Sequence, residues 1–302
     1  MKSKDGSFQA APGKVERRRL DIHDGRYRLP VEIIEPPVRS MGATGPTLVF
    51  LHEGLGSIAQ WRDFPDAVSL GAHLPAVVYE RGGHGNADPL NAPRSVNYLH
   101  AEALQSLPEV LRQLQIDDAI LIGHSDGGSI ALIFAAVRPE KVRGIITEAA
   151  HVFVEEVTLA GIREAVRIYT STDLPDRLSK YHGSNTEAVF RGWSETWLSR
   201  DFRDWNIEEY LPGVRCPVLA IQGRDDEYGT PAQVDAIVNG VSGPAEPLVL
   251  TDCGHVPHVQ AREKVLAEMT RFILDDCVKS SDAALRCIPR HCGVRKSTPH
   301  SS

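Results

Sequence analysis

Cysteine is scarce in this chain, and its pattern excludes two kinds of scaffold. The 302 residues include five cysteines, an odd number with no CxxC spacing. The sequence therefore predicts neither a disulfide framework nor a cysteine-based metal site. Long apolar runs are also missing: no run reaches the ~20 residues that a membrane-spanning helix needs, so we expect no membrane partner. No apolar segment precedes Pro12, so we expect no secretory signal and a cytoplasmic location.

A basic surface is missing from most of the chain. The net charge is −7, but residues 1–19 and 278–302 each carry +4, which leaves −15 for residues 20–277. Nucleic-acid binding depends on clustered Lys and Arg, so the acidic body argues against a nucleic-acid partner. The basic ends are interpreted as solvated tails.

A strand–helix alternation is what the sequence does contain. An Asp-Gly hairpin signal at 24–25 comes first, and buried apolar runs follow, beginning with Thr47–His52. The remaining runs expected as strands are Pro75–Glu80, Asp118–Ile122, Lys141–Thr147, Pro217–Gln222 and Pro247–Thr251. Helical patterns separate these runs, as at Ser95–Gln115 and Ser125–Val137. This order predicts an α/β fold, a mostly parallel sheet with helices on both faces.

The alternation stops once, over residues 152–212, where the pattern is helical throughout. This segment, which we name the insertion, contains three of the four tryptophans. The predicted organisation is a core formed by 19–151 and 213–277 and interrupted by a helical cap at 152–212. Residues 1–18 and 278–302 are expected to be disordered ends.

One motif carries a specific chemistry. Residues 123–127 read Gly-His-Ser-Asp-Gly, which is G-x-S-x-G between a predicted strand and a predicted helix. The sharp turn needs small neighbours, which the glycines supply, and it presents Ser125 at a helix N-terminus. This context favours Ser125 as a nucleophile over a glycine-rich turn with an incidental serine.

A serine nucleophile needs a base and an acid that orients the base. His255 follows the last predicted strand and is the candidate base, with His258 as a rival three residues on. A metal site at these two histidines would lack a third ligand, so we expect no metal. The acid is expected after the strand that ends near 222, at Asp226 or Asp225, with Glu148 on the same sheet edge as the alternative.

The loop after Thr47–His52 is expected to complete the site. Its glycines allow close backbone approach, so the N–H groups of Gly54 and Asp126 are the predicted oxyanion donors, with Leu55 as the alternative to Gly54. The same loop can be read as G-x-G-x-x-A, a dinucleotide fingerprint with Glu80 at the end of the next strand. That reading would leave Ser125, Asp226 and His255 as coincidences, so no cofactor is expected.

Five segments together resemble the α/β-hydrolase fold superfamily of serine hydrolases. They are LHEGLGS at 51–57, YERGGHG at 79–85, GHSDGG at 123–128, QGRDDEYGT at 222–230 and CGHVPH at 253–258. The resemblance covers about 20–277. It implies Asp226 as the acid, because the family's acid commonly falls three residues after the loop glycine, and Gly54 as an oxyanion donor. It also implies that the insertion covers the active site. Glu53 departs from the family, which usually has glycine there.

The sequence therefore predicts an esterase-like enzyme of 3.1.1 type that acts through an acyl-enzyme. The expected substrate is a small carboxylic ester, lactone or thioester with an apolar or aromatic group, because the insertion is rich in aromatic residues. Those aromatic residues can equally form the insertion's own core. Hydrolysis of carbon–carbon bonds in aromatic ring-cleavage products is the alternative reaction, and a non-catalytic ligand-binding relative is the alternative class. We expect a monomer or homodimer.

Overall fold

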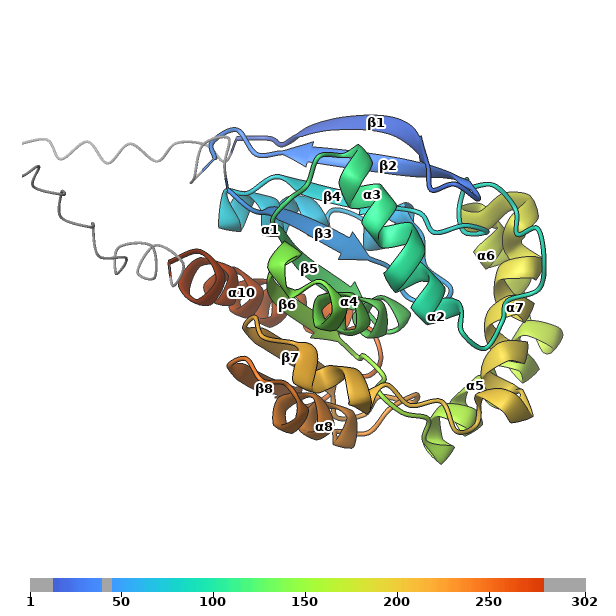
Figure 1. Ribbon diagram of the computed structural model, residues 1–302. Helices are drawn as coiled ribbons and strands as arrows, with labels where there is room; N and C mark the ends of the chain where they lie inside the picture. Colours follow the sequence, from blue (N-terminus) through green and yellow to red (C-terminus); the bar gives the residue numbers. More distant parts are fainter. Residues whose placement is uncertain (1–12, 40–44, 280–302) are drawn as a thin grey trace, which may run out of the picture.

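The computed structural model describes residues 13–39 and 45–279. An eight-stranded sheet in the order β1-β2-β4-β3-β5-β6-β7-β8 forms its centre (Figure 1). The strands are β1 (Glu16–His23), β2 (Arg28–Glu35), β3 (Thr47–Leu51), β4 (Ala76–Tyr79), β5 (Ala119–His124), β6 (Val142–Glu148), β7 (Val218–Gly223) and β8 (Ala245–Leu250). Strands β3 to β8 pair in parallel, and β2 pairs antiparallel with both β1 and β4.

The central strands are buried on both faces, which is why they are apolar at every position. In β3, Leu48 and Phe50 belong to one hydrophobic core, and Val49 and Leu51 belong to a second core on the other face. Successive side chains of a strand point to opposite faces, so a continuous apolar run serves both cores.

Helices complete the two cores. The core helices are α1 (Phe64–Ala72), α2 (Tyr98–Ala101), α3 (Leu107–Gln113), α4 (Asp126–Val137), α8 (Ala232–Gly240), α9 (Pro257–Gln260) and α10 (Arg262–Phe272). Residues of α1 and α10 pack in the core that contains Phe50, and residues of α2, α3, α4 and α8 pack in the core that contains Val49. The predicted α/β fold, a mostly parallel sheet with helices on both faces, is confirmed.

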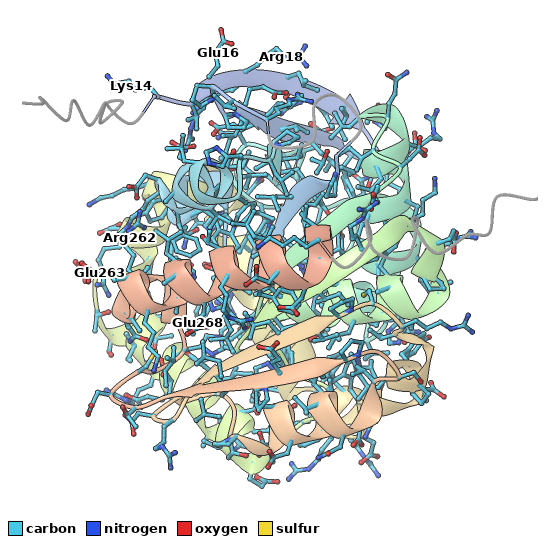
Figure 2. All side chains as sticks on the ribbon, turned by 90° about the vertical axis from the view of Figure 1, so that its left-hand side faces the viewer. Lys14, Glu16, Arg18, Arg262, Glu263 and Glu268 are labelled. Carbon is cyan, nitrogen blue, oxygen red and sulfur yellow. The ribbon has the colours of Figure 1, made fainter. Side chains whose placement is uncertain are left out.

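The described part of the N-terminal segment differs from the expectation of a disordered end. Strand β1 begins at Glu16, and Arg17 and Arg18 pair across from Ile34 and Ile33 of β2. Glu16 and Arg18 extend outward from this edge strand (Figure 2). The polar residues that suggest a disordered end also suit an edge strand, where charged side chains discourage further strand pairing. Residues 1–12 lie outside the described range.

The insertion between β6 and β7 contains three α-helices, α5 (Glu156–Ser171), α6 (Leu174–His182) and α7 (Thr186–Leu198). They gather together at one end of the sheet (Figure 1). At the other end of the chain, α10 continues as a π-helical segment, Ile273–Lys279. The predicted C-terminal tail beyond Lys279 lies outside the described residues. Across 13–39 and 45–279, no helix combines the length and apolar character that crossing a membrane requires.

Candidate active site

Ser125 occupies a strained turn between β5 and α4. Its backbone has φ 51° and ψ −116°, a left-handed conformation that costs a residue with a Cβ roughly 1–3 kcal/mol. Its amide donates to the Glu148 carbonyl at 2.8 Å, which ties the turn to the end of β6. A Cβ at Gly123 would overlap the Gly127 backbone, and one at Gly127 would overlap the backbone of Leu51. The glycines of the motif therefore leave room for the sharp turn.

His255 and Asp226 meet at the same edge of the sheet. His255 Nδ1 lies 2.9 Å from both carboxylate oxygens of Asp226. The ring of His124, the residue before Ser125, lies 5.2 Å from the His255 ring between centroids. Because β5, β7 and β8 are parallel, their carboxyl ends bring the serine, the acid and the histidine to one edge.

The Asp226 carboxylate is surrounded by donors. The Tyr228 amide donates to Oδ1 at 2.8 Å, and Gln222 Nε2 donates to Oδ2 at 2.5 Å. Burial alone would raise the pKa of Asp226, but the hydrogen bond and charge of His255, with the Tyr228 amide, lower it overall. The group is therefore an ionised acceptor that can hold an imidazole N–H.

The two alternative acids lie elsewhere. Glu148 Oε2 accepts from both the backbone amide and Nδ1 of His258 at 2.9 Å, so Glu148 pairs with the rival histidine. Asp225 is exposed, and its backbone amide donates to the Cys253 carbonyl at 2.9 Å. Of the three candidate acids, Asp226 is the one that the structure brings to His255.

The loop after β3 places unpartnered amides near this edge. Across the described ranges, no hydrogen bond is made by the backbone N–H of Gly54 or of Leu55. The N–H of Asp126, the first residue of α4, is likewise without an acceptor in the part of the chain that the structure covers. All three amides are thus available to an external acceptor. The G-x-G-x-x-A segment leads into a short 3-10 helix, Ile58–Trp61, instead of the α-helix that a dinucleotide site uses.

Glu53, the departure from the family pattern, has a specific partner. Its Oε2 lies 3.4 Å from Nδ1 of His124, while Nε2 of His124 donates to the His255 carbonyl at 2.7 Å. Burial alone would lower the pKa of His124, but the Glu53 carboxylate outweighs burial and raises it to about 9. A charged histidine therefore joins the loop after β3 to the loop of His255.

The Asp126 side chain belongs to a buried network that the sequence did not reveal. Its Oδ2 accepts from Tyr98 Oη at 2.8 Å and lies 3.4 Å from Arg81 Nη1. Tyr98 Oη in turn accepts from Trp197 Nε1 of α7 at 2.9 Å. The sequence carries one signal of this network: the glycine-rich segment 81–85 contains the positive Arg81, and the glycine-rich segment 123–128 contains the negative Asp126. Only the fold shows that the two charges meet.

The insertion contributes aromatic residues to the site and to its own packing. A Cβ at Gly54 would lie 2.5 Å from Cδ1 of Trp193, so the indole lies directly against the loop after β3. The Tyr228 ring lies 4.7 Å from the His255 ring and 6.1 Å from the Trp193 ring, between centroids. The other two tryptophans of the insertion, Trp197 and Trp205, pack on the fully buried Phe202. Trp197 and Trp205 thus form part of the insertion's own packing, whereas Trp193 lies against the loop after β3.

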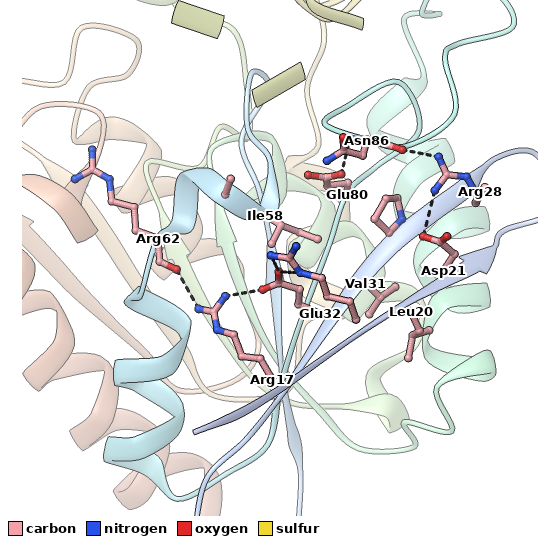
Figure 3. Close-up of a pocket in the computed structure, with 13 residues that line it drawn as sticks. Arg17, Leu20, Asp21, Arg28, Val31, Glu32, Ile58, Arg62, Glu80 and Asn86 are labelled. Atoms are coloured by element: carbon pink, nitrogen blue, oxygen red, sulfur yellow. Dashed lines mark hydrogen bonds and ion pairs between the residues drawn. The ribbon is translucent and has the colours of Figure 1, made fainter. Parts of the chain in front are cut away.

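A separate cavity of about 630 Å³ lies between β1, β2 and the segment 58–62 (Figure 3). Four arginines line it, together with acidic residues, and none of the predicted site residues does. Arg17 and Arg19 pair with the buried Glu32, and Arg28 pairs with Asp21. Most charges of the cavity wall are thus paired with one another. The cavity is separate from the sheet edge that holds Ser125. Within the described ranges, no cluster of three or more His, Cys, Asp or Glu could hold a metal ion.

Comparisons with known proteins identify the fold family. The family model of the alpha/beta hydrolase fold matches residues 46–206. The proline iminopeptidase of Lactobacillus delbrueckii subsp. bulgaricus is 24% identical over 255 residues, which cover 72% of this chain and 86% of that protein. The 2-hydroxy-6-oxononadienedioate/2-hydroxy-6-oxononatrienedioate hydrolase 1 of Dechloromonas aromatica is 26% identical over 266 residues, 78% of this chain and 87% of that protein. The crystal structure of a Mycobacterium smegmatis proline iminopeptidase superposes with a TM-score of 0.72 at 18% identity, over 87% of this chain and 100% of that one. Since the family model covers more than half of the sequence, the chain belongs to the alpha/beta hydrolase fold family.

Proposed function

We propose that this protein is a serine hydrolase that cleaves a carboxylic ester, lactone or thioester of a small substrate through an acyl-enzyme. The observation that carries the proposal is the Asp226–His255 pair at 2.9 Å, on the sheet edge where Ser125 occupies its strained turn. A nucleophile, a base and an orienting acid in this chain order are the parts that acyl transfer requires.

The proposed mechanism assigns one role to each group. Ser125 Oγ attacks the carbonyl carbon while His255 Nε2 accepts the hydroxyl proton, and Asp226 holds the Nδ1–H and stabilises the imidazolium. The oxyanion forms hydrogen bonds to the N–H groups of Gly54 and Asp126. His255 then protonates the leaving group, water attacks the acyl-enzyme with His255 as base, and Ser125 is regenerated.

The substrate class follows from the residues that surround the site. Trp193 rests on Gly54 and Tyr228 covers one side of His255, so two aromatic faces border the proposed oxyanion site. Aromatic walls favour an apolar or aromatic acyl or alcohol group, because pockets bind chiefly through apolar contact and orient through a few polar groups. We propose that the insertion serves as the cap under which such a group binds.

Carbon–carbon bond hydrolysis of a ring-cleavage product is the second candidate. It is favoured by the Dechloromonas aromatica relative, which is named as a hydrolase of 2-hydroxy-6-oxononadienedioate and 2-hydroxy-6-oxononatrienedioate and which aligns over 87% of its length. The same serine, histidine and acid would serve, so the two reactions differ in the substrate that the cap admits.

The test combines a covalent label with a substrate panel. A fluorophosphonate probe is expected to modify Ser125, located by peptide mass spectrometry, and the Ser125→Ala variant should stay unlabelled. The panel contains p-nitrophenyl esters of rising chain length, lactones, a 2-hydroxy-6-oxo-dienoate and proline p-nitroanilide. Turnover of esters or lactones supports the first candidate, and turnover of the dienoate alone supports the second. Labelling without any turnover would favour a non-catalytic binding protein, and equal turnover by Ser125→Ala would refute the mechanism.

A further inference from the structure

Three consecutive carbonyl groups of the loop after β3 each accept a hydrogen bond from a different histidine. The pairs are Glu53 O with His52 Nδ1 at 2.8 Å, Gly54 O with His84 Nε2 at 3.0 Å, and Leu55 O with His182 Nε2 at 2.9 Å. All three imidazoles are buried. We name these three residues the histidine clamp. Two of its members belong to the core, and His182 is the last residue of α6 in the insertion.

The surroundings of His182 and His52 fix which ring nitrogen carries the proton. The Gly85 amide donates to Nδ1 of His182 at 2.9 Å, so the proton resides on Nε2, which faces the Leu55 carbonyl. The Arg81 amide donates to Nε2 of His52 at 3.1 Å, so Nδ1–H of that ring donates to Glu53. Each ring therefore accepts on one side and donates to the loop on the other.

His84 also faces the loop with Nε2, which lies 3.0 Å from Gly54 O, but both of its ring nitrogens have further contacts. Arg94 Nη2 lies 3.1 Å from Nδ1 and 3.3 Å from Nε2, and Nδ1 lies 3.3 Å from the Gly82 carbonyl oxygen. Burial lowers the pKa of His52, His84 and His182. The clamp thus consists of neutral imidazoles, and His52 and His182 each have one defined tautomer.

The clamp determines where the loop amides point. In a trans peptide the C=O and the next N–H point in opposite directions, so holding the Glu53 and Gly54 carbonyls directs the N–H groups of Gly54 and Leu55 away from the histidines. The Gly56 amide closes the turn by donating to Glu53 O at 3.0 Å. His182 donates to the remaining carbonyl, that of Leu55, and so fixes the end of this turn. The amides of Gly54 and Leu55, in the middle of the turn, are free of acceptors within the described residues.

We propose that His182 is a positioning residue that sets the oxyanion donors of the core, so that the oxyanion hole is complete only when the insertion is docked. The inference rests on the proposed function, because it assigns a purpose to the Gly54 and Leu55 amides. The His182 imidazole accepts a hydrogen bond from the Gly85 amide and donates one to the Leu55 carbonyl, so it joins the insertion both to the core and to the loop that holds the proposed oxyanion donors.

Asn185 provides a matched control for this role. It is also buried in the insertion, and its Nδ2 donates to the carbonyls of Gly85 at 3.4 Å and Ala87 at 3.0 Å. It thus anchors the insertion to the same stretch of the core as His182, but within the described residues its side chain forms no hydrogen bond with residues 53–56. Replacing each by leucine removes two buried polar contacts, and only His182→Leu releases the oxyanion loop.

The experiment compares His182→Leu, Asn185→Leu and the conservative His182→Gln. Loss of a whole oxyanion donor costs roughly 100- to 1,000-fold in kcat, so a displaced pair of donors should lower kcat roughly 10- to 100-fold in His182→Leu, with KM changed less than about threefold. Asn185→Leu should keep kcat within about threefold, and His182→Gln, which retains an amide donor, should recover part of the loss. Hydrogen-exchange mass spectrometry should show faster exchange of amides 53–56 in His182→Leu alone.

The outcomes separate this inference from the proposed function. If the wild-type protein neither turns over the substrate panel nor takes the fluorophosphonate label, the proposed function fails, while the exchange comparison still tests the clamp. Equal exchange of residues 53–56 in His182→Leu and Asn185→Leu, or equal kcat values in an active wild-type background, would overturn the inference. Those results would mean that His182 only fastens the insertion.

Discussion

Replacing Asp226 by asparagine tests the assignment of the acid most directly. In the structure every neighbour of this carboxylate is a donor: His255 Nδ1, the Tyr228 amide and Gln222 Nε2, all between 2.5 and 2.9 Å away. An asparagine introduces an NH₂ group that must face one of these donors. Where it faces His255, Nδ1 becomes the acceptor and the ring proton moves to Nε2, the atom that has to accept the proton of the serine.

The expected loss of kcat in Asp226→Asn can be estimated. Asparagine removes the negative charge that stabilises the imidazolium, and the change of tautomer removes the base. The corresponding substitution in a serine protease lowers kcat by about 10⁴, so we expect Asp226→Asn to lower kcat by roughly 10³ to 10⁴, equivalent to about 4–5.5 kcal/mol of transition-state stabilisation. KM should change little, because Asp226 lies behind the histidine.

Two further variants complete the comparison. Glu148→Gln weakens the buried pair with His258, so its free energy of unfolding should fall by roughly 1–3 kcal/mol while kcat stays within about tenfold. Asp225→Asn changes an exposed side chain and should leave both quantities nearly unchanged. Kinetics on a p-nitrophenyl ester, urea unfolding and titration of active sites with the fluorophosphonate probe measure the three effects. The assignment of Asp226 as the acid is refuted if Asp226→Asn retains more than about a tenth of the wild-type kcat while Glu148→Gln or Asp225→Asn, still folded, falls below a tenth of it.

Three other predictions follow from the same geometry. Ser125→Ala should abolish turnover and keep the stability, whereas Ser125→Gly should abolish turnover and stabilise the fold by about 1 kcal/mol, because glycine adopts φ 51° without strain; equal unfolding curves would contradict this. The pKa of His124 is raised from 6.5 to about 9, so its pair with Glu53 stabilises the fold fully below about pH 6.5, and this contribution is lost as the pH rises through 9. Urea titrations between about pH 6 and pH 10 should show wild type losing about 3 kcal/mol more than His124→Gln, and parallel losses would argue against the charged pair. Trp193→Ala uncovers Gly54 and should raise kcat/KM for long-chain esters relative to short ones; an unchanged ratio would remove Trp193 from the substrate site.

The sequence predicted the features that depend on local chemistry. The run 47–51 is apolar throughout because a central parallel strand faces two cores, and Gly123 and Gly127 are glycines because the turn at Ser125 leaves no room for a Cβ. Such features leave a signal within a few residues. The fold and the motif at Ser125 are therefore evident without coordinates.

Features that depend on distant pairings could not be predicted in the same way. The polar start of β1 resembles a tail until Arg17 is seen against Glu32, and the run of acids at 225–227 gives no reason within itself to prefer Asp226. The histidine clamp joins residues up to 127 positions apart in the sequence, as His182 and Leu55 show. Its members resemble ordinary buried histidines until the loop carbonyls are located.

The histidines of two acid–histidine pairs lie three residues apart, His255 in the loop after β8 and His258 in α9, and their environments explain why only His255 is proposed to be catalytic. His258 gives both its amide and its Nδ1 to Glu148, and its ring is enclosed by Trp61 and Phe64 at 4.7 and 5.4 Å between centroids. Its side chain is 5% exposed, compared with 12% for His255. General base catalysis requires the imidazole to reach the reacting proton, and the greater exposure of His255 favours it over His258 for the proposed role. The same kind of acid–histidine pair thus anchors the start of α9 at His258 and is proposed to move protons at His255.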